Sequence, residues 1–241
     1  MFFGIVLVAT LLFFLIFGTP IAVSVGLATI LAMLTAGDTA ALPAITQKMF
    51  TSIDSFPLLA LPLFTLSGEL MEISGISERL VRFMKMLFRK LPAPSACITS
   101  ISCAFFGAIS GSAPATSAAI GGIMIDPMKK AGYSGAEAAA VTASSASLGI
   151  IIPPSIPMVV FATTASVSVG SLFMAGVIPG IILCAAFCIM HGFRFGRVET
   201  PTKERLTAKE AVTTFWDAIF ALGMPVIILG GIYGGFFTPT E

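Results

Sequence analysis

Charged side chains are scarce in this sequence. Asp, Glu, Lys and Arg make up 10% of the 241 residues, whereas 56% are hydrophobic. An average soluble domain carries about 25% charged residues, and the mean hydropathy here is +1.01. These values exclude an ordinary soluble domain and indicate an integral membrane protein with several spans. The formal net charge of +1 gives no reason to expect nucleic-acid binding.

Motifs for several kinds of chemistry are also lacking. The sequence has no nucleotide-binding motif, no nucleophile–base constellation and no metal-ligand cluster. None of the four cysteines forms a CxxC pair, and all of them lie in apolar runs. Cys184 and Cys188 could be half of a metal site, but small packing residues are the favoured interpretation. An enzyme is therefore not indicated.

Long apolar runs are what the sequence does contain. They lack the roughly ten-residue alternation of a membrane barrel, so the spans are predicted to be helices. Met1–Phe17 lacks the basic start and the cleavage site of a signal peptide and is interpreted as a mature helix. A span needs about 20 residues, and several runs are too short to cross alone. The runs fall near 2–17, 20–36, 56–73, 94–109, 115–126, 136–152, 155–170, 172–192 and 213–237.

Two interruptions fall between short apolar runs. The stretch FGAISGSAPATSAAI, from Phe106 to Ile120, places a polar turn between two half-length segments. The stretch IIPPSIP, residues 151–157, contains three prolines, which remove backbone donors and prevent one continuous helix. The first interruption predicts a helical hairpin over 94–128, and the second predicts a broken helix over 136–170.

The positive charges predict the orientation. Of the 13 Lys and Arg residues, five lie in 79–90, two are Lys129 and Lys130, and five lie in 194–209. All three clusters are expected on the cytoplasmic side. The hairpin 94–128 lies between two of them, so it must enter and leave on the same face. The same reasoning directs 172–192 inward and places the N-terminus in the periplasm.

The segment 76–90 has basic residues on one helical face and apolar residues on the other. It predicts an amphipathic helix at the cytoplasmic interface. A simple anchor and a lever arm remain equally open.

Titratable residues in or beside the apolar runs have ordinary interpretations. Asp126 is expected to form a local ion pair with Lys129 or Lys130. Glu137 fits a helix start, where the helix dipole favours negative charge. His191 is expected at the interface, beside Arg194.

The two interruptions also predict an ion site. A polar turn at membrane depth is tolerated only inside protein or beside a wet cavity. Hydroxyl and carbonyl oxygens without a carboxylate favour Na⁺ over Ca²⁺ or Mg²⁺, and a helix N-terminus favours a carboxylate. Two broken elements close together are typical of a secondary transporter. The alternative is a pair of packing kinks made by small residues.

The segment from Phe105 to Gly180 resembles the large membrane subunit of the tripartite ATP-independent periplasmic (TRAP) transporters, and the resemblance extends over essentially the whole chain. The final TPTE, residues 238–241, is also similar to the family, where the chain continues into a second half. The sequence is therefore predicted to be the N-terminal half of an inverted repeat, ending in a truncated or partial second half.

The resemblance implies an all-α, polytopic, elevator-type transporter with a re-entrant helical hairpin and a discontinuous helix. It implies a division of the chain into a scaffold, an arm, a moving transport domain and connecting parts. These parts are scaffold helices 1–75, an interfacial arm 76–91, a transport-domain part 92–171, a membrane helix 172–192, a cytoplasmic connector 193–211 and the first helix of the second half, 212–241.

The resemblance also implies the site. The substrate-site candidates are Ser110, Gly111, Ser112, Ala113, Pro114 and Thr116. The Na⁺-site candidates are Ser110, Gly111, Ser112, Thr116, Gly149, Ile152, Pro153 and Ser155.

The implied function is Na⁺-coupled import of organic acids, such as C4-dicarboxylates or sialic acid, across the bacterial inner membrane. The implied partners are a small four-helix membrane subunit, a periplasmic substrate-binding protein, the organic acid and the lipid bilayer, without nucleic acid. Na⁺ is the coupling ion, and no organic cofactor is expected. Two alternatives remain open: a sodium/dicarboxylate symporter that needs no binding protein, and a structural or channel-forming membrane subunit.

The predicted orientation can be tested at position 203. A Lys203→Cys variant of the intact protein should resist a thiol reagent that reaches only the periplasmic face, because this connector is predicted to be cytoplasmic. The same reagent should label it after the membrane is permeabilised. Labelling of intact cells would overturn the topology.

Overall fold

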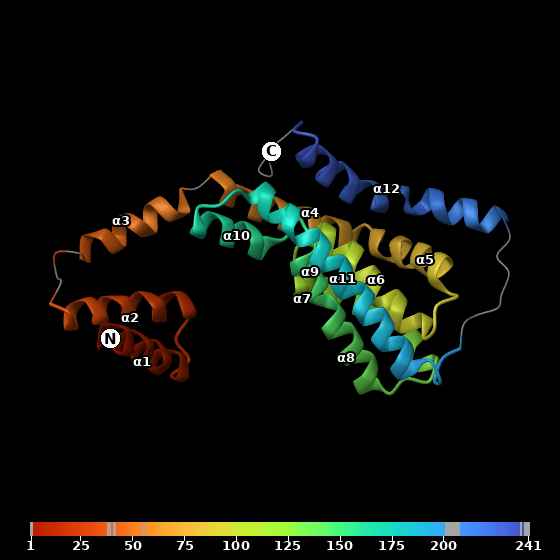
Figure 1. The fold of residues 1–241 in the computed structure, drawn as a ribbon, viewed down its shortest axis with the longest axis horizontal. Coiled ribbons are helices and arrows are strands. Elements are labelled where there is room, and N and C mark those ends of the chain that lie inside the picture. Colours follow the sequence, from red (N-terminus) through yellow and green to blue (C-terminus); the bar gives the residue numbers. More distant parts are fainter. Residues whose placement is uncertain are drawn as a thin grey trace. The chain divides into compact units, whose positions relative to one another are not determined.

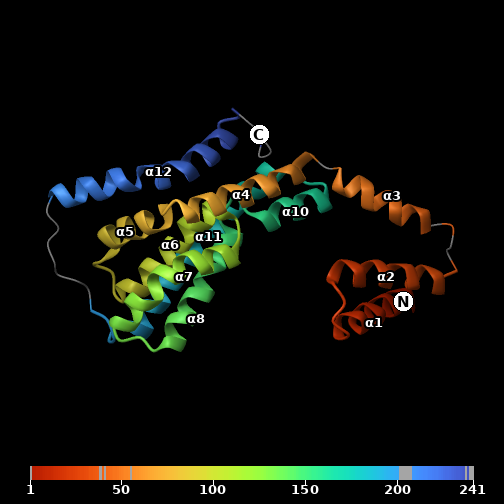
Figure 2. The ribbon, with the colours of Figure 1, turned by 180° about the vertical axis from the view of Figure 1, so that it is seen from behind.

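The computed structural model describes residues 2–37, 40, 42–54, 56–200, 208–236 and 238. Every regular element in these residues is helical (Figures 1 and 2). The chain divides into two compact units, residues 1–55 and 56–241. An all-helical membrane fold was predicted, and the helical and apolar character is confirmed. Residues 201–207, in the predicted connector, and 239–241, in the TPTE end, lie outside the described residues.

The first unit contains α1 (Phe2–Ile16), α2 (Ile21–Thr35) and α3 (Leu42–Ile53). The first two helices pack against each other. Their connection turns at Gly18, with a φ of 76°, and the Thr19 hydroxyl lies 2.6 Å from the Ser24 hydroxyl. The predicted runs 2–17 and 20–36 are thus confirmed as helices. The sequence analysis did not predict α3, because its residues fall between the apolar runs.

The second unit consists of a short 3₁₀ turn and nine α-helices among the described residues. Two helices, α11 and residues 210–233 of α12, are each long and apolar enough to cross a membrane. The pair α8–α9 and α10, bent by 42°, passes the same test together. The elements are η2 (Phe56–Leu59), α4 (Ala60–Ile73), α5 (Ile76–Phe88), α6 (Pro94–Ser110), α7 (Ala113–Lys130), α8 (Gly135–Ala146), α9 (Leu148–Ile151), α10 (Ile156–Ala165), α11 (Val169–Phe195) and α12 (Ala208–Tyr233).

Two helix boundaries differ from the predicted ones, because serine residues at the helix ends determine where each helix stops or starts. The broken helix ends at Ala165 rather than residue 170, because Ser166 takes a left-handed conformation. Helix α11 then begins at Val169 rather than 172, and the Ser168 side chain accepts a hydrogen bond from the Ser171 N–H. A serine N-cap starts a helix regardless of where the apolar run begins.

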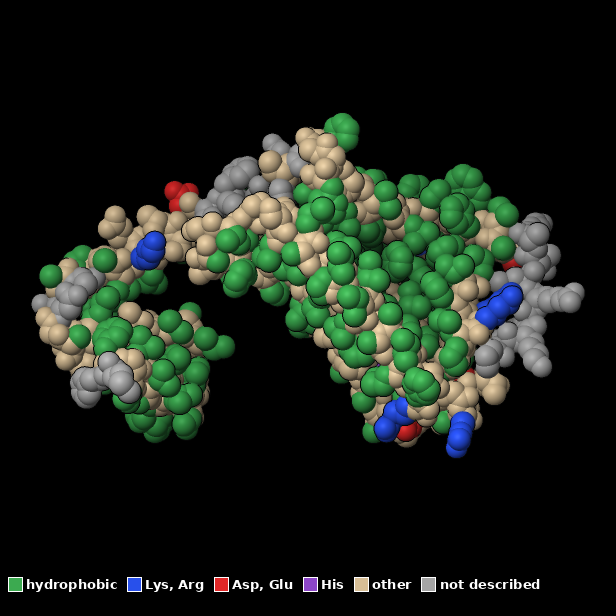
Figure 3. Space-filling model, viewed as in Figure 1, with side chains coloured by type: hydrophobic (Ala, Val, Ile, Leu, Met, Phe, Trp, Pro, Cys, Tyr) green, Lys and Arg blue, Asp and Glu red, His purple; other side chains and the backbone are tan. Residues whose placement is uncertain are grey.

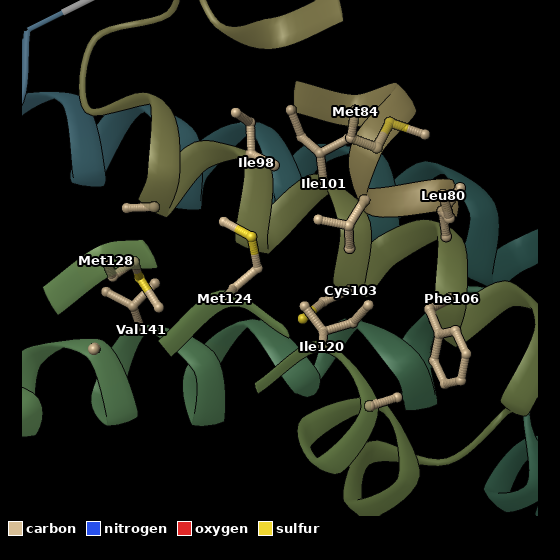
Figure 4. Packing of buried hydrophobic residues seen from close by; sticks show 14 of the residues in the cluster. Leu80, Met84, Ile98, Ile101, Cys103, Phe106, Ile120, Met124, Met128 and Val141 are labelled. Carbon is tan, nitrogen blue, oxygen red and sulfur yellow. The ribbon is translucent and has the colours of Figure 1, made fainter. Parts of the chain in front are cut away.

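Helix α6 lies at the centre of the second unit. It contacts α4, α5, α7, α8, α9, α11 and α12. Its buried side chains Ile98, Ile101 and Phe106 belong to one apolar core with Ile120 and Met124 of α7 (Figure 4).

Helix α5 contributes its apolar face to this core. Leu80, Val81 and Met84 are at most 1% exposed and pack in the same cluster as α6 and α7. Leu87, by contrast, is 56% exposed. The amphipathic pattern is confirmed, but most of the apolar face covers protein rather than facing lipid.

The segment after α11 is held by Glu199. Its carboxylate accepts hydrogen bonds from the Ser95 N–H at 2.9 Å, the Ser95 hydroxyl at 2.7 Å and the Tyr133 hydroxyl at 3.1 Å. It therefore caps the first turn of α6, where the helix dipole also favours negative charge. Burial and the nearby Glu199 carboxylate raise the pKa of Tyr133. The predicted solvated connector thus starts later than residue 193, because α11 continues to Phe195 and Glu199 is bound.

Two local electrostatic predictions are confirmed. Asp126 and Lys129 lie 3.6 Å apart on the exposed end of α7. Glu137 forms a capping box with Ser134 at the start of α8. In that capping box the Ser134 N–H and hydroxyl both donate hydrogen bonds to the Glu137 carboxylate, at 2.9 and 2.8 Å.

Replacing Glu199 by Ala should lower the stability of the intact protein. The change leaves the Ser95 N–H without its partner, and such a loss costs about 1–3 kcal/mol. Tyr133→Phe should have a smaller effect of about 0.5–1.5 kcal/mol, because it removes one hydrogen bond only. Thermal denaturation in detergent measures both, with Glu78→Ala on the exposed side of α5 as the control. A Glu199→Ala midpoint equal to the control would contradict the capping role.

Candidate functional site

Helices α6 and α7 form an antiparallel hairpin joined by two residues. Gly111 adopts a left-handed conformation with a φ of 60°, and the extended Ser112 is the N-cap of α7. Near the open end of the hairpin, the Thr99 hydroxyl lies 3.8 Å from the Met128 sulfur. Pro114 falls in the first turn of α7, where a missing donor does no harm. The predicted helical hairpin is therefore confirmed, while its re-entry on one membrane face stays a prediction.

Three oxygens gather at the tip of this hairpin. The Thr116 hydroxyl donates a 2.7 Å hydrogen bond to the Ser112 carbonyl and lies 3.1 Å from the Ser110 hydroxyl. Ser110 is 3% exposed and Thr116 is fully buried. Oxygen atoms in such surroundings need polar partners, and here they find them in one another.

The second interruption is a real break in the helix. Helix α9 ends at Ile151, Ile152 is extended, and α10 begins at Ile156 after a cis peptide bond between Pro153 and Pro154. The Ser155 hydroxyl donates to the Ile150 carbonyl at 2.7 Å, so it satisfies a carbonyl that the break would otherwise free. The prediction of a discontinuous helix is confirmed.

The hairpin tip and the break are in direct contact. The Ile156 N–H donates a 3.1 Å hydrogen bond to the Gly111 carbonyl. A Cβ on Gly111 would lie 3.0 Å from the Pro154 carbonyl oxygen. A Cβ on Gly149 would lie 2.7 Å from the Thr116 hydroxyl and 3.2 Å from the Ser112 carbonyl oxygen. The structure thus brings together two segments that the sequence showed only as separate irregularities. We call this contact the junction; it consists of Ser110–Thr116 of the hairpin and Gly149–Ile156 of the broken helix.

Four helix ends meet at the junction. Helices α6 and α9 end there, and helices α7 and α10 begin there. The C-terminal ends present carbonyl oxygens and partial negative charge, and the N-terminal ends present N–H groups and partial positive charge. The junction can therefore attract a cation and a carboxylate at neighbouring places.

All ten predicted site residues belong to the junction, and six of them take part in the contacts that join its two segments. Ala113 is half-buried and Pro114 is exposed. The Ile152 side chain is directed at α11, where it would lie 2.5 Å from a Cβ on Gly180. Pro153 is buried within the break. The residues that meet are Ser110, Gly111, Ser112, Thr116, Gly149 and Ser155.

The sequence analysis missed several glycines that make the junction possible. A Cβ on Gly107 would lie 2.3 Å from the Gly149 Cα, so α6 and the broken helix touch backbone to backbone. Gly68 of α4 similarly faces Ser110, and Gly176 and Gly180 of α11 face the break. A glycine inside a helix costs about 1 kcal/mol relative to Ala. A glycine inside a predicted helix is therefore the one feature of the sequence that could have indicated a close approach of two helices.

His191 lies in the protein interior and not at the interface. It is 1% exposed, and its Nε2 lies 3.0 Å from the Ser100 hydroxyl, which lies 2.7 Å from the Ser145 hydroxyl. The prediction was wrong because α11 continues four residues past His191 and packs this turn against α6. A buried imidazole is retained where a polar partner meets it. The result is a polar link between α11, α6 and α8.

Among the described residues, no group of three or more His, Cys, Asp and Glu side chains could hold a metal ion. The oxygens of the junction come from hydroxyl and carbonyl groups instead. Such a set suits a monovalent cation better than the carboxylate-rich sites of Ca²⁺ or Mg²⁺.

Discontinuous helices that meet inside a helical membrane protein are typical of transporters. The family comparison agrees with this class. Residues 8–241 match the model of the tripartite ATP-independent periplasmic transporter, DctM component, and the chain belongs to this family. Members of the family are transporter permeases and not enzymes.

Individual relatives match between 81% and 95% of this chain. The isethionate TRAP transporter permease protein DctMQ of Oleidesulfovibrio alaskensis is 42% identical over 95% of this chain and 36% of its own length. The C4-dicarboxylate TRAP transporter large permease protein DctM of Vibrio cholerae is 41% identical over 94% of this chain and 50% of its own length. The sialic acid TRAP transporter large permease protein SiaM of the same species is 37% identical over 81% and 46%. The chain thus spans about half the length, or less, of these curated relatives.

Adding one methyl group at Gly107 should disrupt the junction. Gly107→Ala places a carbon 2.3 Å from the Gly149 backbone, and such overpacking costs about 1–3 kcal/mol. The matched control is Gly122→Ala in α7, where nothing lies within 4 Å, and it should be neutral or stabilising. The thermal midpoints of the two variants of the intact protein measure the difference. Equal midpoints would show that the backbone contact is not required.

Proposed function

We propose that the chain forms part of a Na⁺-coupled secondary transporter that imports organic acids. The observation that carries this proposal is the junction, where buried hydroxyls, main-chain carbonyls and four helix ends meet. Relatives are named for isethionate, C4-dicarboxylates and sialic acid, which are all organic anions. A site that attracts both a cation and a carboxylate fits an acid carried together with Na⁺.

The two ligands have distinct places in this proposal. The Ser110 and Thr116 hydroxyls and the Ser112 carbonyl form the core of the Na⁺ site, beside the Gly149 backbone. The N-terminal turns of α7 and α10 face the carboxylate of the substrate. The sodium ion offsets the negative charge of the acid, so each ligand favours the binding of the other. This reciprocity is the thermodynamic basis of coupling.

The transporter works in this proposal with two partners and by an elevator motion. The family name is tripartite and periplasmic, which supports a periplasmic substrate-binding protein and a small membrane subunit. The hairpin α6–α7 is re-entrant, the N-terminus is periplasmic, and the complex lies in the inner membrane. The relatives are about twice as long as this chain or longer, and a second half would complete the substrate site.

Uptake by the intact transporter tests the proposal. The complex is reconstituted in proteoliposomes and supplied with labelled C4-dicarboxylate, sialic acid or isethionate. Saturable uptake of one acid, driven by an inward Na⁺ gradient and requiring its binding protein, is expected. Uptake without the binding protein would favour the independent symporter. Uptake that neither saturates nor responds to Na⁺ would favour a channel.

Removing the Ser112 hydroxyl should weaken the Na⁺ dependence of uptake. Ser112→Ala deletes a candidate ligand and also the N-cap of α7, to which Ala115 N–H donates at 3.4 Å. The Na⁺ concentration for half-maximal uptake should rise several-fold, while Ser112→Thr, which keeps a hydroxyl, should retain most of the response. Ser144→Ala is the control, because that hydroxyl bonds only to carbonyls of its own helix. An unchanged Na⁺ response in Ser112→Ala would remove the Ser112 hydroxyl from the site, while the Ser112 carbonyl, which the substitution keeps, would remain a candidate ligand.

A further inference from the structure

A pocket lies in the same unit, at the opposite end of the hairpin from the junction. It has a volume of about 370 Å³ and is bounded by α5, the first turn of α6, the last part of α7 and α12. Three of its side chains are the cations Arg82, Lys85 and Arg89, which recur along one face of α5. We call it the basic pocket; its remaining lining residues are Met86, Pro94, Ser95, Ile98, Pro127, Glu199 and Thr214.

The basic pocket carries an excess of positive charge. Glu199 is its one acidic lining residue among those described, and its carboxylate already accepts hydrogen bonds from Ser95 and Tyr133. No carboxylate in the described part of the chain lies within 4 Å of the charged nitrogens of Arg82, Lys85 or Arg89. Arg82 is exposed, whereas Lys85 and Arg89 are half-buried, and partly buried charges of one sign are costly unless an opposite charge joins them. The pocket therefore favours an anion.

Burial strengthens the preference of the pocket for an anion at Lys85. The side chain is half-buried, and burial lowers the pKa of its ammonium from the ordinary value. The charged form is disfavoured because it has lost water. A bound anion would restore the interaction that water no longer provides, so it would bind more tightly here than at a fully exposed lysine.

The two helices α5 and α12, which both contribute to the pocket, also carry exposed apolar side chains elsewhere on their surfaces. Leu87 of α5 and Trp216 and Phe220 of α12 are 56%, 62% and 73% exposed. Phe83 and Phe215 join α5 to α12, with ring centroids 6.0 Å apart. Figure 3 shows hydrophobic side chains along α12, which runs beside α5 in Figure 1. A ligand with an anionic head and long apolar tails would match the basic pocket and also cover exposed apolar side chains of these two helices, whereas a free phosphate would match only the pocket.

We propose that the basic pocket binds the phosphate group of an anionic phospholipid, with the acyl chains lying along the exposed apolar side chains of α5 and α12. Arg82 and Arg89 pair with the phosphate, because the guanidinium group is suited to phosphate oxygens. Basic pockets between helices on the cytoplasmic side are known to receive lipid head groups, and the charge pattern predicts that side for α5. The lipid bridges α5 and α12 at the level of the membrane surface. This site is independent of the junction and of what is transported.

Lipid binding by the intact, delipidated transporter tests the proposal. Native mass spectrometry and thermal shift are measured with phosphatidylglycerol and with phosphatidylcholine. Phosphatidylglycerol alone should bind and stabilise the protein. The double variant Arg82→Gln/Arg89→Gln should bind it about 30-fold more weakly, at about fivefold per lost charge.

A matched control variant has the same net charge as the double arginine variant. Lys90→Gln/Lys130→Gln also removes two positive charges, both exposed and both outside the pocket lining, and it should bind the lipid like the parent. Lys85→Met, which keeps the apolar stem, is the second pocket variant if the arginine pair fails to fold. Equal losses in pocket and control variants, or equal binding of phosphatidylcholine, would overturn the site. Displacement of the lipid by millimolar inorganic phosphate would overturn the lipid assignment in favour of a free anion.

Discussion

The rest of the second unit depends on one close approach, the contact between Gly107 of α6 and Gly149 of the broken helix. With no side chain on either residue, the backbones approach closely enough for Ile156 N–H to reach the Gly111 carbonyl. That hydrogen bond matters because a main-chain group left alone in apolar surroundings costs about 1–3 kcal/mol. The hairpin and the broken helix therefore satisfy each other, and neither would be stable in this conformation without its partner.

The positions of the irregular segments could be predicted from the sequence, because each one violates a strong local rule. Ser, Gly and Pro do not continue an apolar helix, so the turn at Gly111 and the break at Ile152 follow from composition and proline sterics. The amphipathic pattern of α5 likewise follows from the helical period. The basic clusters gave an orientation that the described structure leaves as a prediction.

The contacts between distant segments could not be predicted in the same way. Nothing in the local pattern says that residue 111 bonds to residue 156, or that Glu199 caps a helix that begins at residue 94. The position of His191 illustrates the reason. Its neighbours in sequence include Arg194 and indicate an interface, but its neighbours in space are Ser100 and Ser145. Tertiary packing decided its burial, and helix α3 was missed because it lacks a long apolar run.

The capping of α6 by Glu199 also limits how far α12 can lie from α6. Because the carboxylate fixes the chain to α6, the length of chain that separates this fixed point from α12 is counted from Glu199 rather than from the end of α11. From there to Ala208 the chain advances about nine residues, and a fully extended chain spans at most about 3.3–3.6 Å per residue. The distance between Glu199 and Ala208 is therefore limited to about 30 Å. Whatever excursion accompanies transport, the anchored end of α6 and the first turn of α12 cannot separate further than this.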